Sequence, residues 1–370
     1  MTARRILIVQ DYLRSGGTER QSIHLARAFR ARGHNASLLT FRPCGILADS
    51  LGDVPCAALQ PFDTGLNWFA PGLARVVRRT APEIVLLMGR MAHAVGAGLT
   101  TVVPEARLVA TLRTGKVLTR RYELALHRAA HVVSNSAESA ARLRGPLGLP
   151  AERVSVIRNA LVFEPAAALA AELRSAVRMA ERVPEGTPVM LCVGMLRPEK
   201  NQRALIEAAA RLPAGLDWRL WFAGEGPERE PCAALARSLG LADRVRFLGF
   251  QADPRPLYAA ADLAVLTSRA ESLSNFLIEA QAHGLPVVAA RATGVTECVR
   301  DGFSARLVEP DDPTVFAGAM LAYLNDPVER RNAGRLGAVH ALSSFAPPAR
   351  ADDYLTLFER LLSPFSFGDT

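Results

Sequence analysis

The sequence has few of the features that stabilise secreted or zinc-dependent proteins. Its five cysteines are scattered over 370 residues and form no CxxC pair, which argues against both a disulfide framework and a zinc site. The sequence contains no uninterrupted run of about 18 apolar residues, so we expect no membrane-spanning helix. The first apolar run is too short for a signal peptide. We therefore expect a protein of the reducing cytoplasm.

Aromatic residues are also scarce, at 6% of the chain, whereas hydrophobic residues make up 49%. This combination fits an α/β protein rich in Ala, Leu and Val. A chain of 370 residues is too long for one ordinary hydrophobic core, so two domains are expected.

Positive charge is concentrated in the first half of the chain. Residues 1–165 contain 22 Lys and Arg against 11 Asp and Glu, whereas residues 166–370 contain 22 against 25. A basic half indicates a negatively charged neighbour, which could be a membrane surface, nucleic acid or an acidic substrate. No basic stripe interleaved with aromatic residues and no zinc-finger spacing occurs, so nucleic acid is not expected. A solvated Arg-rich surface is the alternative.

Two carboxylates, Glu271 and Glu279, flank seven residues in the segment 267–290. A helical pattern begins at Asn275, with Ser274 or Asn275 as its N-cap, and a glycine and a proline follow its end. The free N–H groups of a helix N-terminus bind anions. Carboxylates on either side of such a site suit a ligand with a central phosphate and hydroxyls at both ends, such as a nucleotide sugar. A capped surface helix with two solvated carboxylates is the alternative.

A second motif, GMLRPEKN at 194–201, places two cations near another helix start. Pro198 fits the first helical position, so Arg197 and Lys200 stand close to the helix N-terminus. Fixed cations there can neutralise a diphosphate leaving group as its charge grows. A solvated helix cap is again the alternative.

The order of the expected elements predicts two Rossmann-like domains. Strand-like runs occur at 5–9, 38–40, 84–88, 107–112, 132–134 and 153–160, and again at 189–193, 219–226, 245–250, 263–267 and 286–290. Each series opens with a strand, a glycine loop and a helix. We expect an N-terminal, acceptor-binding domain at 1–165 and a nucleotide-sugar-binding domain at 166–345. The segment 161–187 is the best linker candidate, and 346–370 holds a final amphipathic helix.

These motifs resemble those of the retaining nucleotide-sugar glycosyltransferases of glycosyltransferase family 4, whose two Rossmann-like domains face each other across a cleft (the GT-B fold). The resemblance covers nearly the whole chain. It implies that Glu279 holds the ribose and that Glu271 lies against the transferred sugar. It also implies that Lys200 contacts the diphosphate. The backbone between the two glutamates would hold the diphosphate, through Leu273, Ser274, Asn275 and Phe276.

Three other segments resemble the family, and the last of them departs from it at one position. The SGGTE loop implies that Gly16 and Gly17 approach the donor phosphate and the acceptor, although a plain turn is as consistent with a glycine pair. Phe250 corresponds to the segment that recognises the base. Met195 stands where the family has Arg, and Arg197 could replace that cation.

In the first domain, Arg113 stands where the family places a catalytic-site His. A guanidinium stays protonated and cannot act as a base, but Arg113 could bind the sugar or the phosphate. His93 is another candidate, for which packing is the better explanation. The spacing of His127 and His131 could suit a metal, but His131 begins a strand, so the two are not expected to share a helical face.

The resemblance implies transfer of a hexose or N-acetylhexosamine from a nucleotide donor, expected to be a UDP-sugar, to a glycan or lipid-linked acceptor with retention of configuration. No Asp-x-Asp triplet occurs, so no metal and no other cofactor are expected. A lipid-linked acceptor would suit the inner face of the cell membrane, where anionic lipid could attract the basic half. The alternatives are a GDP-mannose-type donor, a nucleotide-sugar epimerase of the same fold, and a protein that only binds nucleotide sugar.

Overall fold

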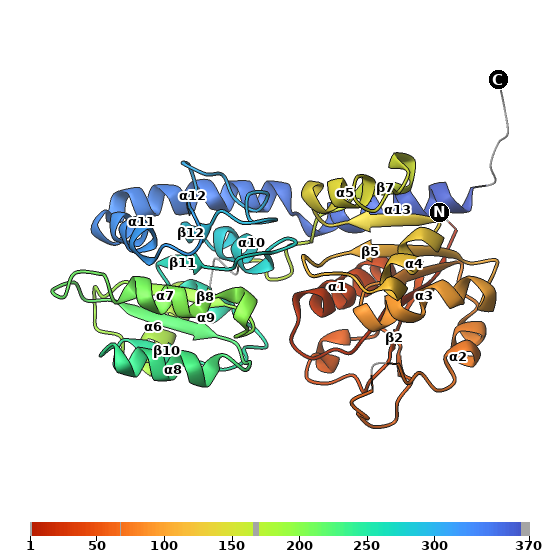
Figure 1. The fold of residues 1–370 in the computed structure, drawn as a ribbon, viewed down its shortest axis with the longest axis horizontal. Helices are drawn as coiled ribbons and strands as arrows, with labels where there is room; N and C mark the ends of the chain where they lie inside the picture. The colour runs from red at the N-terminus through yellow and green to blue at the C-terminus, as the bar shows by residue number, and fades with distance from the viewer. Residues whose placement is uncertain (1, 67, 166–169, 364–370) are drawn as a thin grey trace, which may run out of the picture. The chain divides into compact units, whose positions relative to one another are not determined.

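The computed structural model describes residues 2–66, 68–165 and 170–363, which form two compact units (Figure 1). Unit 1 runs from the N-terminal end to Ala160 and resumes at Pro347, and unit 2 is Leu161–Ala346. The backbone N–H of Leu161 donates to the carbonyl of Phe345 at 2.9 Å. This bond joins the two ends of unit 2, so the chain changes unit at Ala160 rather than after residue 165.

Unit 1 is built on a seven-stranded, all-parallel sheet with the order β3-β2-β1-β4-β5-β6-β7. Its elements, with η marking a 3₁₀ helix, are β1 (Arg5–Gln10), α1 (Gly17–Ala31), β2 (Asn35–Thr40), η1 (Ala48–Leu51), β3 (Cys56–Ala58), α2 (Leu73–Thr80), β4 (Ile84–Leu87), α3 (Arg90–Val102), β5 (Arg107–Leu112), α4 (Arg120–Arg128), β6 (His131–Ser134), α5 (Ala137–Arg144), η2 (Ala151–Arg153), β7 (Val154–Val156) and α13 (Pro347–Leu362).

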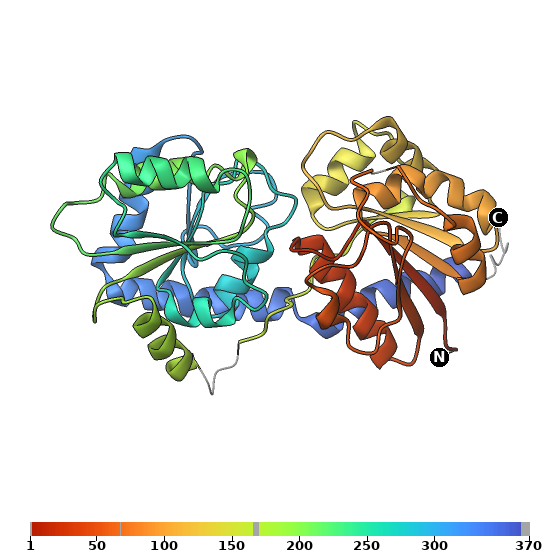
Figure 2. The ribbon, with the colours of Figure 1, turned by 90° about the horizontal axis from the view of Figure 1, so that it is seen from below.

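Helices cover both faces of this sheet, which explains why its central strands are almost continuously apolar. Figure 2 shows α1 and α13 on one face and the helices from α3 to α5 on the other. Helix α13 is held to α1 by aromatic edge contacts, in which the Phe29 ring lies 6.3 Å from that of Tyr354 and 5.7 Å from that of Phe358. The last helix of the chain is therefore part of unit 1. Residues 364–370 of the expected C-terminal segment lie outside the described residues.

Unit 2 is built on a six-stranded parallel sheet with the order β10-β9-β8-β11-β12-β13. Its elements are α6 (Ala170–Ala180), β8 (Val189–Val193), η4 (Pro198–Lys200), α7 (Gln202–Ala209), β9 (Arg219–Ala223), α8 (Arg229–Ser238), β10 (Val245–Phe247), α9 (Arg255–Ala260), β11 (Leu263–Leu266), α10 (Asn275–Ala282), β12 (Val287–Ala290), β13 (Ala305–Val308), α11 (Pro313–Asn325) and α12 (Pro327–Ser344).

Both sheets share one topology. The first strand of each unit lies centrally, the next two extend the sheet to one side, and the chain then crosses to the other side. The order therefore reverses between β1 and β4 in unit 1 and between β8 and β11 in unit 2. In open parallel sheets, ligands bind beyond the carboxyl ends of the strands at such a switch point.

The structure adds two strands that the sequence patterns did not predict, β3 and β13. Each is short and lies at the edge of its sheet. An edge strand is paired and covered less completely, so β3 has only partly buried or exposed residues and lacks the apolar run that marks a buried strand.

The linker prediction for 161–187 is wrong at residues 170–180, where helix α6 forms and packs against α9. Arg174 donates to the carboxylate of Asp262 at 2.7 Å and Arg178 donates to it at 3.2 Å. Both arginines also donate to the carbonyl of Ala260, near the end of α9. An Ala-rich composition suits a helix as well as a linker, so composition alone could not separate the two. Residues 166–169 of this segment lie outside the described residues.

Candidate functional site

The switch point of unit 2 lies between β8 and β11, and the loops after these strands carry the main predicted site residues. The loop after β8 leads through η4 to α7 and contains Arg197 and Lys200. The loop after β11 contains Glu271 and leads to α10. Thr267 connects the two loops, because its hydroxyl donates to the carbonyls of Lys200 and Asn201 at 3.3 and 2.8 Å.

Lys200 and Glu271 form an ion pair across these loops, with 2.5 Å between Lys200 Nζ and Glu271 Oε1. The Glu271 side chain is 10% exposed and that of Lys200 is 27% exposed. A pair so placed is less screened by solvent than one on the open surface. The structure thus brings together two residues that stand 71 positions apart in the sequence.

The N-terminus of α10 begins where the sequence indicated. Ser274 is the N-cap, and its hydroxyl accepts a hydrogen bond from the Leu277 N–H at 3.4 Å. The Ser274 N–H donates to Cys298 Sγ at 3.2 Å, and Cys298 donates to the carbonyl of Gly294 at 3.1 Å. Helix α10 then begins at Asn275, and the positive end of its helix dipole lies at this terminus.

Gly294 fits closely against the loop before α10. Its φ is +70°, and a Cβ on it would lie 2.4 Å from the carbonyl oxygen of Ser272. A side chain there would displace the backbone between Glu271 and Ser274, so the position requires glycine. The sequence patterns did not single out Gly294 or Cys298 as supports of the site.

Glu279 lies inside α10 and is 6% exposed. Its Oε2 accepts a hydrogen bond from the Tyr258 hydroxyl at 2.7 Å, and Tyr258 stacks on Phe276 with 6.3 Å between ring centroids. Tyr258, from α9, is therefore a partner of the second glutamate that the sequence patterns missed. Leu273 and Phe276 are themselves buried, which leaves their backbone as the part able to contact a ligand.

The loops after β8, β9 and β10 are joined by backbone hydrogen bonds. The Gly194 N–H donates to Ala223, Leu196 donates to Glu225, and Gly224 donates to Gly249, at 2.9, 3.0 and 2.7 Å. Met195 and Arg197 are both half-buried in the first of these loops. Among the described residues, the Arg197 guanidinium forms no ion pair, and Arg197 therefore remains a candidate for the cation that Met195 does not provide.

Phe250 follows β10, directly after Gly249, and is half-buried. The next residue, Gln251, donates to the carbonyl of Leu248 at 2.8 Å, which closes a local turn. The loop thus lies at the carboxyl edge of the unit 2 sheet, with the loops that carry Lys200 and Glu271.

In unit 1, Gly16 is the N-cap of α1 and Gly17 is its first residue. The Glu19 carboxylate accepts from the N–H groups of Arg14 and Gly16 at 2.6 and 3.0 Å. A Cβ on Gly16 would lie 2.6 Å from Glu19 Oε1. Glu19 therefore fills the inside of the glycine loop, and its position three residues after the N-cap is the sequence signal for this arrangement.

Asp11 lies at the switch point of unit 1, directly after β1. Its carboxylate accepts from the N–H groups of Arg90, Met91 and Ala92 at 2.9, 2.7 and 3.2 Å. Burial raises the pKa of Asp11, and these three hydrogen bonds oppose that shift. Asp11 thus fixes the start of α3 beside the glycine loop.

Arg113 follows β5 and donates to the side-chain oxygen of Asn159 and to the Tyr354 hydroxyl, the latter at 3.3 Å. These bonds connect the loop after β5 to Asn159, next to the residue at which the chain leaves unit 1, and to Tyr354 of helix α13. Arg113 belongs to unit 1, whereas Lys200 and Glu271 belong to unit 2. A contact between Arg113 and the substrate stays a prediction.

Packing explains His93, one of the candidate histidines of unit 1. His93 is fully buried, with its Nδ1 2.6 Å from the carbonyl of Gly89, its Nε2 accepting from the Thr111 N–H at 3.1 Å, and its ring stacked on Tyr122 at 3.9 Å. Burial lowers the pKa of His93 to about 4. His131 begins β6 and His127 lies on α4, so they do not share a helical face.

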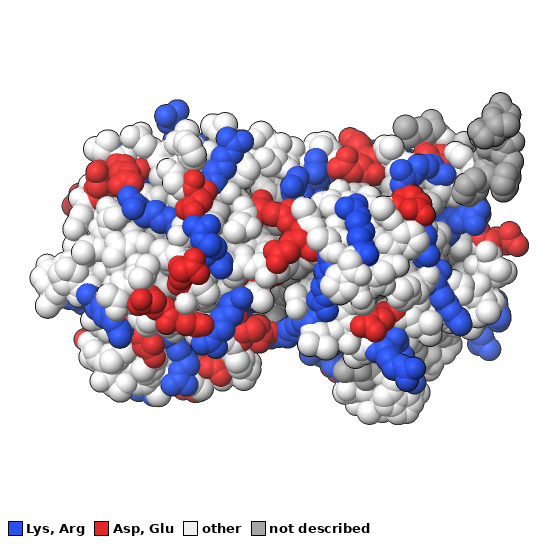
Figure 3. Space-filling view, turned by 45° about the horizontal axis from the view of Figure 1, so that its top comes forward, with Lys and Arg blue, Asp and Glu red and all other residues white. Residues whose placement is uncertain are grey.

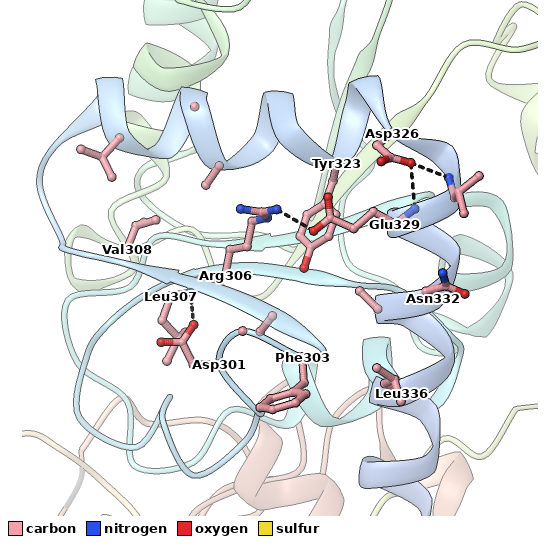
Figure 4. A pocket seen from close by; sticks show the side chains of 17 residues that line it. Asp301, Phe303, Arg306, Leu307, Val308, Tyr323, Asp326, Glu329, Asn332 and Leu336 are labelled. Carbon is pink, nitrogen blue, oxygen red and sulfur yellow. Dashed lines mark hydrogen bonds and ion pairs between the residues drawn. The ribbon is translucent and has the colours of Figure 1, made fainter.

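A separate hollow of about 940 Å³ lies beside β13, α11 and α12 (Figure 4). Arg306 projects into it and pairs with Glu329 at 2.5 Å, with its guanidinium 5.1 Å from the Tyr323 ring centroid. Lys200, Glu271 and Glu279 do not line this hollow.

Every helix in the described part of the chain is too short or too polar to serve as a membrane span. Within the same residues, no group of three or more His, Cys, Asp or Glu side chains is arranged to hold a metal ion.

Comparisons with known proteins agree on one family. The family model described as "Glycosyltransferase Family 4" matches residues 15–163, and that described as "Glycosyl transferases group 1" matches residues 187–326. A lipopolysaccharide core biosynthesis glycosyltransferase, LpsE of Rhizobium meliloti, is 37% identical over 174 residues, which is 47% of this chain and 50% of that protein. The D-inositol 3-phosphate glycosyltransferase of Thermomonospora curvata is 34% identical over 247 residues, 61% of this chain and 56% of that one.

The chain spans about half the length of the curated relatives it matches. Among solved structures, Anabaena HepE in complex with UDP and glucose has a TM-score of 0.82 and 25% identity, covering 96% of this chain and 99% of that one. The parallel sheets of seven and six strands match this GT-B structure over both units. The chain therefore belongs to the glycosyltransferase family 4 group, with the GT-B fold.

Proposed function

We propose that this protein transfers a hexose or N-acetylhexosamine from a UDP-sugar to a glycan or lipid-linked acceptor, with retention of configuration. The observation that carries the proposal is the Lys200–Glu271 ion pair at the β8–β11 switch point, beside the capped N-terminus of α10. Support for the donor comes from HepE, a structural relative that was solved with UDP-glucose. Support for the acceptor class comes from LpsE, whose name refers to the lipopolysaccharide core.

Each site residue contacts a different part of the donor in this proposal. Lys200 and the N–H groups at the start of α10 attract the diphosphate and stabilise its growing charge as the sugar leaves. Glu279, held by Tyr258, accepts from the ribose hydroxyls. Glu271 contacts the sugar. The departing phosphate helps to remove the proton from the acceptor hydroxyl, on the same face of the sugar.

No metal ion is required in this proposal, because Lys200 and the helix N-terminus supply the positive charge. Activity that survives a chelator would agree with this. Unit 1 would bind the acceptor in the cytoplasm, at the inner face of the cell membrane. A GDP-mannose-type donor, an epimerase and a binding-only protein remain the competing functions.

A screen of UDP-, GDP- and ADP-sugars by thermal shift tests the donor, because a ligand at about 100 times its dissociation constant adds about 2.7 kcal/mol to the free energy of unfolding. We expect a UDP-sugar to give the largest shift. Release of UDP only in the presence of an acceptor distinguishes a transferase from an epimerase, which converts the donor alone. Binding without any turnover would leave only the binding function.

A further inference from the structure

Two cysteines that the sequence separates by twelve positions meet in unit 1. Cys44 lies in the loop after β2 and Cys56 begins β3, and their sulfur atoms are 3.2 Å apart. Both are unbridged and half-buried, whereas Cys192, Cys232 and Cys298 are buried in unit 2. A small thiol reagent can therefore reach this pair, while the other cysteines are shielded.

The local fold brings the two sulfur atoms together. Strand β3 runs parallel to β2, with Cys56 opposite Leu38. Thr40 ends β2, and its hydroxyl lies 3.9 Å from Cys44 Sγ. A disulfide bond is about 2.05 Å long, so the two sulfur atoms need to approach by only about 1 Å to form one.

We propose that Cys44 and Cys56 form a redox-active dithiol site, which a low-molecular-weight disulfide such as oxidised glutathione converts to an intramolecular disulfide. The Cys44 thiolate attacks one sulfur of oxidised glutathione, whose S–S bond breaks as a Cys44–glutathione disulfide forms and one glutathione thiolate leaves. The Cys56 thiol gives its proton to that thiolate, and its sulfur attacks Cys44 Sγ and releases the second glutathione. The two protein thiols are oxidised by two electrons, and one disulfide is reduced to two thiols.

The hydrogen bond that Cys56 makes to Cys44 supports this order of attack. It lowers the pKa of Cys44, whereas the same interaction and burial raise the pKa of Cys56. A thiolate is the nucleophile in disulfide exchange, so Cys44 is the attacking residue and Cys56 the resolving residue.

The Cys44 segment is also attached to the glycine loop before α1. The Cys44 carbonyl accepts from the Leu13 N–H at 2.8 Å, and the Leu13 carbonyl accepts from the Leu47 N–H at 2.9 Å. A disulfide would fasten this segment to β3. The Leu13 N–H should then open less often in the oxidised protein than in the reduced protein.

The test treats the reduced protein with oxidised glutathione, blocks the remaining thiols and maps the peptides by mass spectrometry. We expect a linked Cys44–Cys56 peptide from the wild type and a stable glutathione adduct at Cys44 from Cys56→Ser. Modification of Cys44→Ser should be about tenfold slower, since its remaining thiol is the poorer nucleophile. Wild-type protein that forms no linked peptide would overturn the proposal, and this outcome does not depend on either variant folding.

Hydrogen exchange measures the coupling to the glycine loop. The peptide that contains Leu13 should exchange at least about threefold more slowly after oxidation, because opening its hydrogen bond then requires a tethered segment to move. Equal exchange in the two states would overturn the coupling. Neither readout uses a sugar nucleotide, so both are independent of the proposed transferase activity.

Discussion

Lys200 Nζ lies 2.5 Å from Glu271 Oε1, so the two residues that most resemble family site residues form an ion pair with each other. A diphosphate that enters this site must compete with Glu271 for the Lys200 ammonium. The capped N-terminus of α10 adds a second attraction for the same anion.

Replacing Lys200 by Ala should reduce turnover by about a hundredfold or more, because one contact to the developing charge is worth roughly 3 kcal/mol. Stability should fall far less, by roughly 1–2 kcal/mol, since Glu271 loses its partner but keeps some contact with water. Initial rates with the best donor and urea unfolding measure the two effects. Arg237→Ala, an exposed change on α8, is the matched control and should leave the rate unchanged. A folded Lys200→Ala protein with turnover within about threefold of wild type would contradict the role, given the size of that contact.

Arg113→Ala should destabilise unit 1 by about 2 kcal/mol, because it removes charge-assisted hydrogen bonds to Asn159 and Tyr354. Arg113→His keeps a donor and should retain activity, while Arg113→Ala should be less active if the cation also contacts the donor phosphate or an anionic acceptor. Urea unfolding together with kcat and KM separates the two contributions. If the Ala and His variants both match wild type in rate, Arg113 lies outside the site.

The strongly apolar and glycine-marked elements were predictable from the sequence. Patterns of a few consecutive residues predict the central strands and the N-cap at Ser274. Similar patterns mark the loops that carry Lys200 and Glu271. Edge strands β3 and β13 were missed because incomplete burial leaves no apolar run. Helix α6 is hard to distinguish from a linker by sequence, because its docking depends on ion pairs of Arg174 and Arg178 with Asp262 that no local pattern reveals.

The supports of the candidate site were missed for the same reason. Tyr258 reaches Glu279 from another helix, and Cys298 reaches Ser274 from 24 positions away. Outside this site, Cys44 likewise meets Cys56 only after β3 pairs with β2. These are tertiary contacts, and their residue types carry no signal on their own. Glu19 is the exception, because its spacing from Gly16 is a local capping pattern.

Unit 1 should lose stability between pH 6.5 and about 4. Burial lowers the folded-state pKa values of His24, His93 and His131 to about 4. The unfolded chain, with histidine pKa values near 6.5, therefore binds more protons in this range, so the free energy of unfolding falls as the pH falls. Above pH 6.5 the effect is absent. Each histidine contributes at most about 1.4 kcal/mol per pH unit.

Urea unfolding at pH 7.5, 6 and 5 measures this dependence. His93→Gln keeps a polar side chain but cannot titrate, so its stability should vary less with pH by up to about 1.4 kcal/mol per unit. An unchanged pH dependence in this variant would show that His93 is not one of the responsible groups.

The exposed arginines of α2 should hold the protein loosely on anionic membranes. Arg75, Arg78 and Arg79 are exposed on this helix. On the face drawn in Figure 3, basic and acidic side chains alternate over both units, so the attraction must come from local clusters rather than from that whole face. Each Arg near an anionic surface contributes about 1 kcal/mol.

Co-sedimentation with anionic and neutral vesicles at low and high salt checks this expectation. Changing the three α2 arginines to Ser should weaken binding to anionic vesicles by about a hundredfold. The matched control changes the exposed Arg203, Arg211 and Arg237 of unit 2 to Ser and should retain binding. Wild-type binding that is equal for both vesicle types, or absent from anionic vesicles at low salt, would remove the membrane contact from the account.

The most direct test of the central claim is calorimetry of free UDP with wild type, Glu279→Ala and Glu271→Ala. A ribose contact needs no sugar, so Glu279→Ala should lose at least about tenfold in UDP affinity, the cost of a hydrogen bond to a charged group. Tyr258→Phe, which removes the hydroxyl that donates to Glu279, should remain able to bind UDP. Glu271→Ala should bind UDP as tightly as wild type and fail only in sugar transfer. Loss of UDP affinity in Glu271→Ala with full affinity in Glu279→Ala would contradict the assignment of nucleotide and sugar to the two ends of this site.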